Sequence, residues 1–201
     1  MPPEFTREYA EEQLRRSRNP FRRFIKGFYI RNILKDVTGP CIDFACGAGQ
    51  LLARLPHGSA GVEINPFLID ELTGMGLDVK RYDPEADRYS LSEFPENHYS
   101  TCVMSHVLEH FANAAHIAKT LLKSCRRLGI GRIILVLPGW KGYQSDSTHK
   151  SFIDRHYLRD QGVLSCEGYQ LTRLRYYPVN RESVGRYVKF HELIVVLDRA
   201  E

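Results

Sequence analysis

The chain has 201 residues, of which 43% are apolar and 26% are charged, and its formal net charge is +4. This length favours one domain, and no apolar run approaches the roughly 20 residues that a membrane-spanning helix needs. The first residues lack the apolar stretch of a signal peptide. The five cysteines are an odd number without a C-x-x-C pair, which indicates neither a disulfide framework nor a zinc ribbon. We therefore expect a cytoplasmic protein without a membrane span.

The N-terminal segment, residues 1–37, stands outside the pattern of the rest and predicts a helical extension before a single domain over residues 38–201. Residues 13–35 contain eight lysines and arginines and no acidic residue. Four aromatic residues lie among them: Phe21, Phe24, Phe28 and Tyr29. One interpretation is a basic amphipathic arm for phosphate, RNA or an anionic surface. The other is a solvated helix whose rings dock on the core while its arginines face water.

From residue 40 onward, short apolar runs alternate with helical segments. Runs rich in β-branched or aromatic residues predict strands at 40–45, 58–64, 78–83, 98–105 and 132–138. Between them, helices are expected at 49–56, 65–76 and 113–129. Strands that alternate with helices indicate βαβ units and a parallel sheet.

The ends of the expected helices carry recognisable signals. Pro56 stops the first helix, and Asn65 caps the second before a proline. Asn113 is a candidate cap of the third helix, and Gly129 ends it. After this region, residues 169–178 and 190–199 predict two more strands with no convincing helix between them. A final antiparallel hairpin added to the parallel sheet would explain that tail.

A glycine turn and a later acid give the clearest chemical signal. A buried strand ends at Asp43, and Gly47 and Gly49 bracket a tight turn where backbone can approach a ligand. The dinucleotide pattern G-x-G-x-x-G fails at Leu52, which argues against a pyrophosphate loop. Glu63 closes the next strand, where a carboxylate can accept both hydroxyls of an adenosine ribose.

A second motif, H-x-x-E-H, is formed by His106, Glu109 and His110 and has the spacing of an inverted zinc-protease motif. It follows an apolar strand directly, and no helical stretch downstream offers a third ligand. We therefore predict no metal at this motif. His106 stands at the carboxyl end of the fourth strand, where open α/β sheets bind their ligands.

Taken in order, four segments make the sequence similar to the class I S-adenosylmethionine-dependent methyltransferases, in the branch that acts on small molecules and glycans. "IDFACGAG" resembles their first motif, with Ala45 in place of a glycine, and "GVEINP" resembles their second. "VMSHVLEHF" resembles the end of their fourth strand, and "RRLGIGRIILVLPG" the approach to their fifth. The resemblance implies a Rossmann-like, doubly wound, seven-stranded α/β sheet. It would be mostly parallel with an antiparallel last strand, plus the N-terminal helical extension.

The resemblance also implies the cofactor S-adenosyl-L-methionine (SAM) and a set of binding residues. Asp43 and the turn would line its methionine end, Glu63 its ribose, and Ile64 and Asp83 its adenine, with Asp87 competing for the last role. The full set is Asp43, Ala45, Cys46, Gly47, Gly49, Glu63, Ile64, Asp83, Ser105 and His106.

The loop after the fifth strand, residues 138–152, contains a "D-x-T-H" segment like that of small-molecule and glycan-modifying relatives. Trp140, Tyr143 and His149 would contact the acceptor, and His106 and His149 are the candidate general bases. The competing interpretation makes Asp146 and its neighbours a local loop staple and the histidines packing groups.

The expected function is therefore SAM-dependent methyl transfer to oxygen, nitrogen or carbon of a small molecule or sugar. No [DN]-P-P-[FYW] turn follows the fourth strand, which disfavours the amino groups of nucleic-acid bases. The alternatives are an RNA methyltransferase that uses residues 13–35 and a non-catalytic SAM- or adenosine-binding module. A zinc protease is the least favoured.

Overall fold

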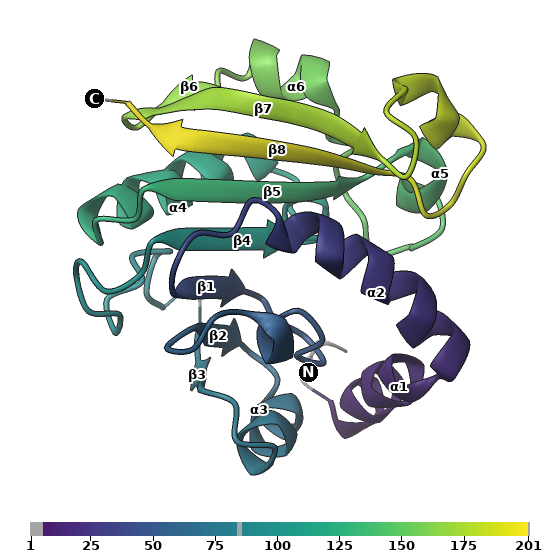
Figure 1. The fold of residues 1–201 in the computed structure, drawn as a ribbon, viewed down its shortest axis with the longest axis vertical. Coiled ribbons are helices and arrows are strands. Elements are labelled where there is room, and N and C mark those ends of the chain that lie inside the picture. The colour runs from purple at the N-terminus through teal and green to yellow at the C-terminus, as the bar shows by residue number, and fades with distance from the viewer. Residues whose placement is uncertain (1–5, 84–85, 201) are drawn as a thin grey trace.

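A computed structural model describes residues 6–83 and 86–200 as an eight-stranded sheet with helices on both faces (Figure 1). The strands are β1 Cys41–Phe44, β2 Ala60–Glu63, β3 Val79–Arg81, β4 Thr101–Ser105, β5 Arg132–Pro138, β6 Ser165–Cys166, β7 Tyr169–Tyr177 and β8 Glu192–Arg199. The α-helices are α1 Arg7–Arg18, α2 Pro20–Leu34, α3 Pro66–Gly74, α4 Ala114–Arg127, α5 Trp140–Tyr143 and α6 Arg155–Asp160. Three short 3-10 helices are η2 Leu52–Arg54, η3 Leu108–His110 and η4 Glu182–Arg186.

The strand order is β3-β2-β1-β4-β5-β8-β7-β6. The first five strands in this order are parallel, whereas β8 pairs antiparallel with both β5 and β7. The predicted Rossmann-like α/β fold with an antiparallel last strand is confirmed, as is the hairpin at the tail. The eighth strand is β6, a two-residue strand beyond β7 that the pattern did not predict.

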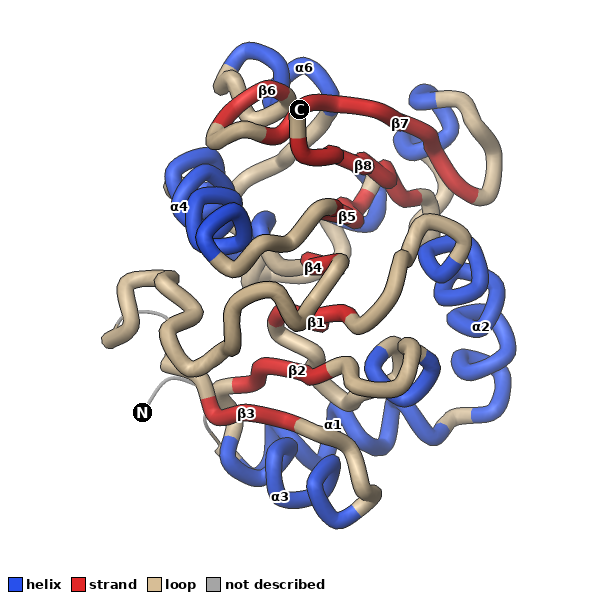
Figure 2. Tube along the Cα trace, turned by 60° about the vertical axis from the view of Figure 1, so that its left-hand side comes forward, coloured by secondary structure: helices blue, strands red, loops and turns tan. Residues whose placement is uncertain are grey.

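The core occupies both faces of the sheet, since the central strands are buried on both sides. On β5, Ile133 and Leu135 pack with α4 on one face, and Ile134 packs with α2 on the other. Figure 2 shows α4 and α2 on opposite sides of the strands. The predicted stripe of α4 is buried as expected, with Ile117, Leu121, Cys125 and Leu128 at most 4% exposed.

One predicted helix is wrong. Residues 49–56 form a tight turn and then only the single 3-10 turn η2. Gly49 has φ +68°, outside the helical region, and Pro56 cannot continue a helix. The segment between them is too short for a stable α-helix. Asn113 takes the cap position of α4 without a side-chain capping bond, whereas Asn65 accepts the Phe67 and Leu68 N–H groups as predicted.

The N-terminal extension forms α1 and α2. The second half of α2 belongs to the core, because Ile30 and Ile33 pack against β5 and β8. Phe21 and Phe24 are 70% and 62% exposed, so the interpretation that the rings dock on the core is wrong for these two, whereas Tyr29 packs edge to face on Tyr177 of β7. The domain boundary at residue 37 stays a prediction. Among the described residues, every helix is too short or too polar to cross a bilayer.

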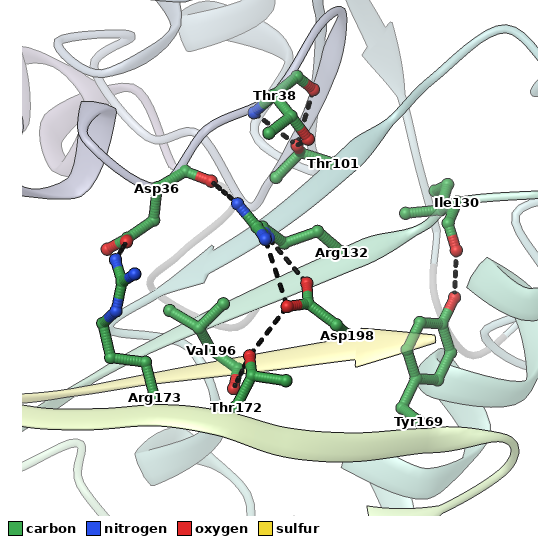
Figure 3. Close-up of polar contacts among 10 residues, drawn as sticks. All are labelled: Asp36, Thr38, Thr101, Ile130, Arg132, Tyr169, Thr172, Arg173, Val196 and Asp198. Atoms are coloured by element: carbon green, nitrogen blue, oxygen red, sulfur yellow. Dashed lines mark hydrogen bonds and ion pairs between the residues drawn. The ribbon is translucent and has the colours of Figure 1, made fainter. Parts of the chain in front are cut away.

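A polar network fastens the end of α2 to the antiparallel strands (Figure 3). The fully buried side chain of Asp36 pairs with Arg173 and Arg175 of β7. The Arg132 guanidinium donates to the Asp36 carbonyl (3.1 Å) and to both carboxylate oxygens of Asp198, the shorter bond being 2.6 Å. Because the Asp36 side chain has no access to water, the two arginines supply the opposite charge that compensates for its burial.

Candidate functional site

The site lies where β1 has β2 on one side and β4 on the other. Because these strands are parallel, the residues that follow β1, β2 and β4 meet at one edge of the sheet. The chain runs outward in opposite directions from this point, and such switch points are where open α/β sheets bind ligands.

The glycine turn after β1 has a backbone that only small residues adopt easily. Ala45, Gly47 and Gly49 have φ of 58°, 54° and 68°. A Cβ on Gly49 would lie 2.6 Å from Leu72 Cδ2, so packing against α3 requires glycine there. A Cβ on Gly47 would meet nothing within 4 Å, so the turn faces open space at that residue. Ala45 keeps the left-handed backbone that the motif's glycine would have.

Glu63 holds this turn in place. Its Oε2 accepts the Gly47 N–H (2.9 Å), and its Oε1 accepts the Ile64 and Asn65 N–H groups (2.8 and 3.0 Å). A carboxylate has about four acceptor positions, so roughly one is left. The ribose role of Glu63 stays a prediction, and this geometry favours one hydroxyl rather than both. The spacing of motifs in the sequence could not predict the three hydrogen bonds that Glu63 accepts from the backbone.

Asp43 is 3% exposed and lies at the end of β1. Burial raises the pKa of its carboxyl to about 7, against the opposing effects of the Lys26 charge and a hydrogen bond from the Leu52 backbone. Among the described residues, its Oδ2 has no hydrogen-bond partner. Buried oxygens of this kind are uncommon, and this one is available to a water molecule or a ligand. Nearby, burial raises the pKa of the Cys46 thiol, which keeps it neutral.

The predicted adenine contacts lie beyond β2 and β3. Ile64 is half-buried, and Asp83 is exposed and accepts the Ala86 N–H (3.1 Å). Asp87 accepts hydrogen bonds from the hydroxyls of Ser90 and Ser92. Burial raises the pKa of Asp87, but these bonds outweigh it and lower the pKa to about 2. Asp87 therefore stabilises its own loop, and Asp83 remains the candidate for the contact with adenine.

Helix α1 lies across the loops that follow β1 and β2. Asn65 Nδ2 donates to the Thr6 carbonyl (3.0 Å), and Gln50 Nε2 donates to the Ser17 carbonyl (3.2 Å). Arg18 pairs with Glu71 of α3. The extension thus lies against the loops that carry the proposed site.

At the end of β4, next to Ser105, His106 has φ 57° and contacts two carboxylates. Its Nδ1 donates to Glu109 Oε1 (3.2 Å) and its Nε2 to Glu192 Oε1 (2.9 Å). Burial lowers the pKa of His106, but these hydrogen bonds outweigh burial and raise it to about 10. A ring that donates from both nitrogens has no lone pair to accept a proton, so the expected role as a general base does not fit. Glu192 is the first residue of β8, and no sequence motif predicted that it belongs to the site.

The loop after β5 brings its predicted residues to the same place. Lys150 and Ser151 donate their N–H groups to the Glu109 carbonyl (2.7 and 3.1 Å), which anchors the loop to η3. His149 Nδ1 donates to the Tyr143 carbonyl (2.8 Å), and its Nε2 lies 3.9 Å from Glu109 Oε1.

The rings around His149 form an aromatic wall. Tyr143 stacks on His149 with centroids 5.6 Å apart, and the 40% exposed Trp140 stacks on Tyr143. The rings of His110 and His149 meet edge to face, 4.8 Å between centroids. Burial lowers the pKa of His110.

The H-x-x-E-H motif does not lie on one face of a helix, because η3 spans only Leu108–His110.

The sheet order, with its antiparallel last strands, is that of the SAM-dependent methyltransferase fold. A SAM-dependent methyltransferase from Archaeoglobus fulgidus superposes with a TM-score of 0.65, with 19% identity over 88% of this chain and 94% of that one. The magnesium protoporphyrin IX methyltransferase of Synechocystis PCC 6803, solved with bound SAM, gives 0.60, with 15% identity over 90% and 85%.

The sequence identifies a family within this fold. Residues 27–143, more than half of it, match the family described as "Methionine biosynthesis protein MetW". The chain belongs to the MetW family. No curated protein sequence matches it.

Proposed function

We propose that this protein binds SAM at the carboxyl ends of β1 and β2 and transfers its methyl group to a small molecule or sugar. Two observations carry the proposal: the open space beside Gly47, whose N–H is bound by Glu63, and the buried Oδ2 of Asp43, which has no hydrogen-bond partner among the described residues. A ligand with an ammonium group and a ribose fits that pair of acceptors. The solved relatives with the same fold support this choice of cofactor.

SAM supplies a sulfonium-activated methyl group, so the protein mainly positions the acceptor and excludes water. Asp43 would accept from the ammonium group, Glu63 from one ribose hydroxyl, and Ile64 and Asp83 would contact the adenine. The cofactor roles of Ala45, Cys46, Gly49, Ser105 and His106 are proposals of the same kind.

The acceptor would lie between His149 and the aromatic wall of Trp140 and Tyr143. Since His149 Nδ1 donates to a carbonyl, the neutral ring has its lone pair on Nε2, where it can take a proton from the acceptor. The protonated His106 would orient neighbouring groups rather than act as a base. The protoporphyrin methyltransferase with this fold acts on a small molecule, in keeping with such an acceptor.

The first prediction uses a matched pair of glycines. Gly47 and Gly76 both have positive φ, and a Cβ on either would meet nothing within 4 Å. Gly47→Ala and Gly76→Ala should therefore lower the free energy of unfolding by the same ~1 kcal/mol. Only Gly47→Ala places a methyl group in the proposed site, so we expect it to weaken SAM binding about tenfold by calorimetry.

Equal SAM affinity in both variants would contradict the proposed site. Binding without methyl transfer to any acceptor from a panel of small molecules and sugars would indicate the non-catalytic module instead. Methylation of RNA that falls steeply with salt would indicate the RNA alternative, since phosphate contacts release counterions.

The second prediction concerns pH. The pKa of Asp43 is about 7 in the free protein, and a bound ammonium group would favour the ionised form and lower it. SAM affinity should therefore be full above pH 7 and fall below it, approaching about tenfold per pH unit, because a proton must leave. Calorimetry from pH 5.5 to 7.5 checks this. Asp43→Asn should remove the dependence, and an equal slope in that variant would contradict the assignment.

A further inference from the structure

We infer that Glu109, His110 and His149 form a binding site for one divalent transition-metal ion. One candidate ligand atom from each of the three side chains lies within 4.8 Å of the other two. They come from η3 and from the loop after β5, which the backbone bonds to the Glu109 carbonyl hold together. Two imidazoles and a carboxylate suit Zn²⁺, Fe²⁺ or Co²⁺ better than Mg²⁺.

One carboxylate oxygen of Glu109 lacks a hydrogen-bond partner among the described residues. Its side chain is fully buried, and Oε1 accepts from His106 while Oε2 has no hydrogen-bond partner among the described residues. A buried carboxylate oxygen without a partner costs free energy that a bound cation would recover.

Both histidines are oriented as metal ligands usually are, with Nδ1–H held by a neighbour. For His149 that neighbour is the Tyr143 carbonyl (2.8 Å). For His110 it is Thr148 Oγ1 (3.1 Å), whose own hydroxyl is donated to Asp146 Oδ1 (2.6 Å). Thr148 therefore accepts from His110, and Nε2 of each neutral ring has a free lone pair.

The ligand atoms lie near one another but must approach slightly to share one ion. Two ligands at about 2.1 Å from a tetrahedral zinc ion lie ~3.4 Å apart, and Glu109 Oε1 and His149 Nε2 are 3.9 Å apart. Sequence reasoning predicted no metal because it sought the third ligand on a downstream helix. His149 on a loop takes that place, and His106 is bound to Glu109 and Glu192 instead.

Three protein ligands leave coordination positions open, as in catalytic zinc sites. These positions would hold the oxygen or nitrogen of a methyl acceptor beside the aromatic wall. With the ion bound, the His149 Nε2 lone pair is a ligand and is not available as a base, and the ion would instead lower the pKa of the acceptor. This last step rests on the proposed methyl transfer, whereas metal binding does not.

The test is zinc retention by the full chain after EDTA dialysis, loading with Zn²⁺ and desalting. Wild type should keep about one ion per chain, and Glu109→Gln and His110→Asn should keep at least about tenfold less. The exposed His116 of α4 gives the control His116→Asn, which should behave as wild type. Thr148→Val, an exposed change that removes the hydrogen bonds of the hydroxyl with His110 and Asp146, should weaken binding about tenfold without unfolding the chain.

Loading with Co²⁺ identifies the ligands, since the chain also has five free cysteines. Visible d–d bands without thiolate charge-transfer absorption support the site. Three results would overturn the proposed site. They are thiolate bands in the Co²⁺ spectrum, no retained metal in the wild type, and full retention of metal by both His110→Asn and Thr148→Val. SAM calorimetry on the same samples reports the cofactor site separately, so failure of one proposal is distinguishable from failure of the other.

Discussion

Replacement of Glu63 by alanine is expected to weaken SAM binding at least tenfold. A hydrogen bond to a charged group contributes about 1.5–3 kcal/mol, and the variant would lose the proposed ribose contact. It also leaves the N–H groups of Gly47, Ile64 and Asn65 without their carboxylate, so the free energy of unfolding should fall by about 2 kcal/mol. Calorimetry and urea unfolding measure the two effects.

A double-mutant cycle separates the ribose contact from the loss of the turn. S-adenosylhomocysteine and its 2′-deoxy and 3′-deoxy analogues serve as ligands. Wild type should lose about tenfold in affinity for one of the two deoxy analogues, and Glu63→Ala should show no further loss. The exposed Glu93→Ala serves as control. If Glu63→Ala discriminates between the analogues as well as wild type does, Glu63 does not contact the ribose.

The second large effect concerns the buried carboxylate of Asp36. The double change Arg173→Met and Arg175→Met removes both partners and leaves a charge without access to water. We expect the free energy of unfolding to fall by about 3–5 kcal/mol, measured by urea denaturation of the full chain. The exposed Arg159→Met should change it by less than about 0.5 kcal/mol.

Adding Asp36→Leu to the double variant should restore most of the stability, because apolar groups then replace the whole charged cluster. A double variant as stable as wild type would show that the arginines do not stabilise Asp36. A triple variant as unstable as the double would assign the loss to packing of the arginine stems instead.

Most strands were predictable because each one is a short apolar run between polar segments. The run at 132–138 coincides with β5, where burial on both faces removes any alternation. The segment 49–56 failed because its apolar spacing suits a helix while a positive φ at Gly49 and the nearby proline do not. The strand β6 has only two residues and carries no periodic signal.

The candidate site was partly predictable for a similar reason. Strand-end residues such as Asp43, Glu63 and His106 were found because parallel strands bring their ends together. Glu192 and the meeting of Glu109 with His149 depend on tertiary packing across 40 or more residues, which no local pattern encodes.

The attachment of α1 has a consequence for ligand exchange. The helix buries only Ala10, and its Arg18–Glu71 pair is solvent-exposed and weak. Lifting α1 therefore breaks few contacts and costs far less than unfolding the sheet. A ligand at the proposed site would therefore enter and leave through a local opening of α1, while the strand ends proposed to bind it stay in place.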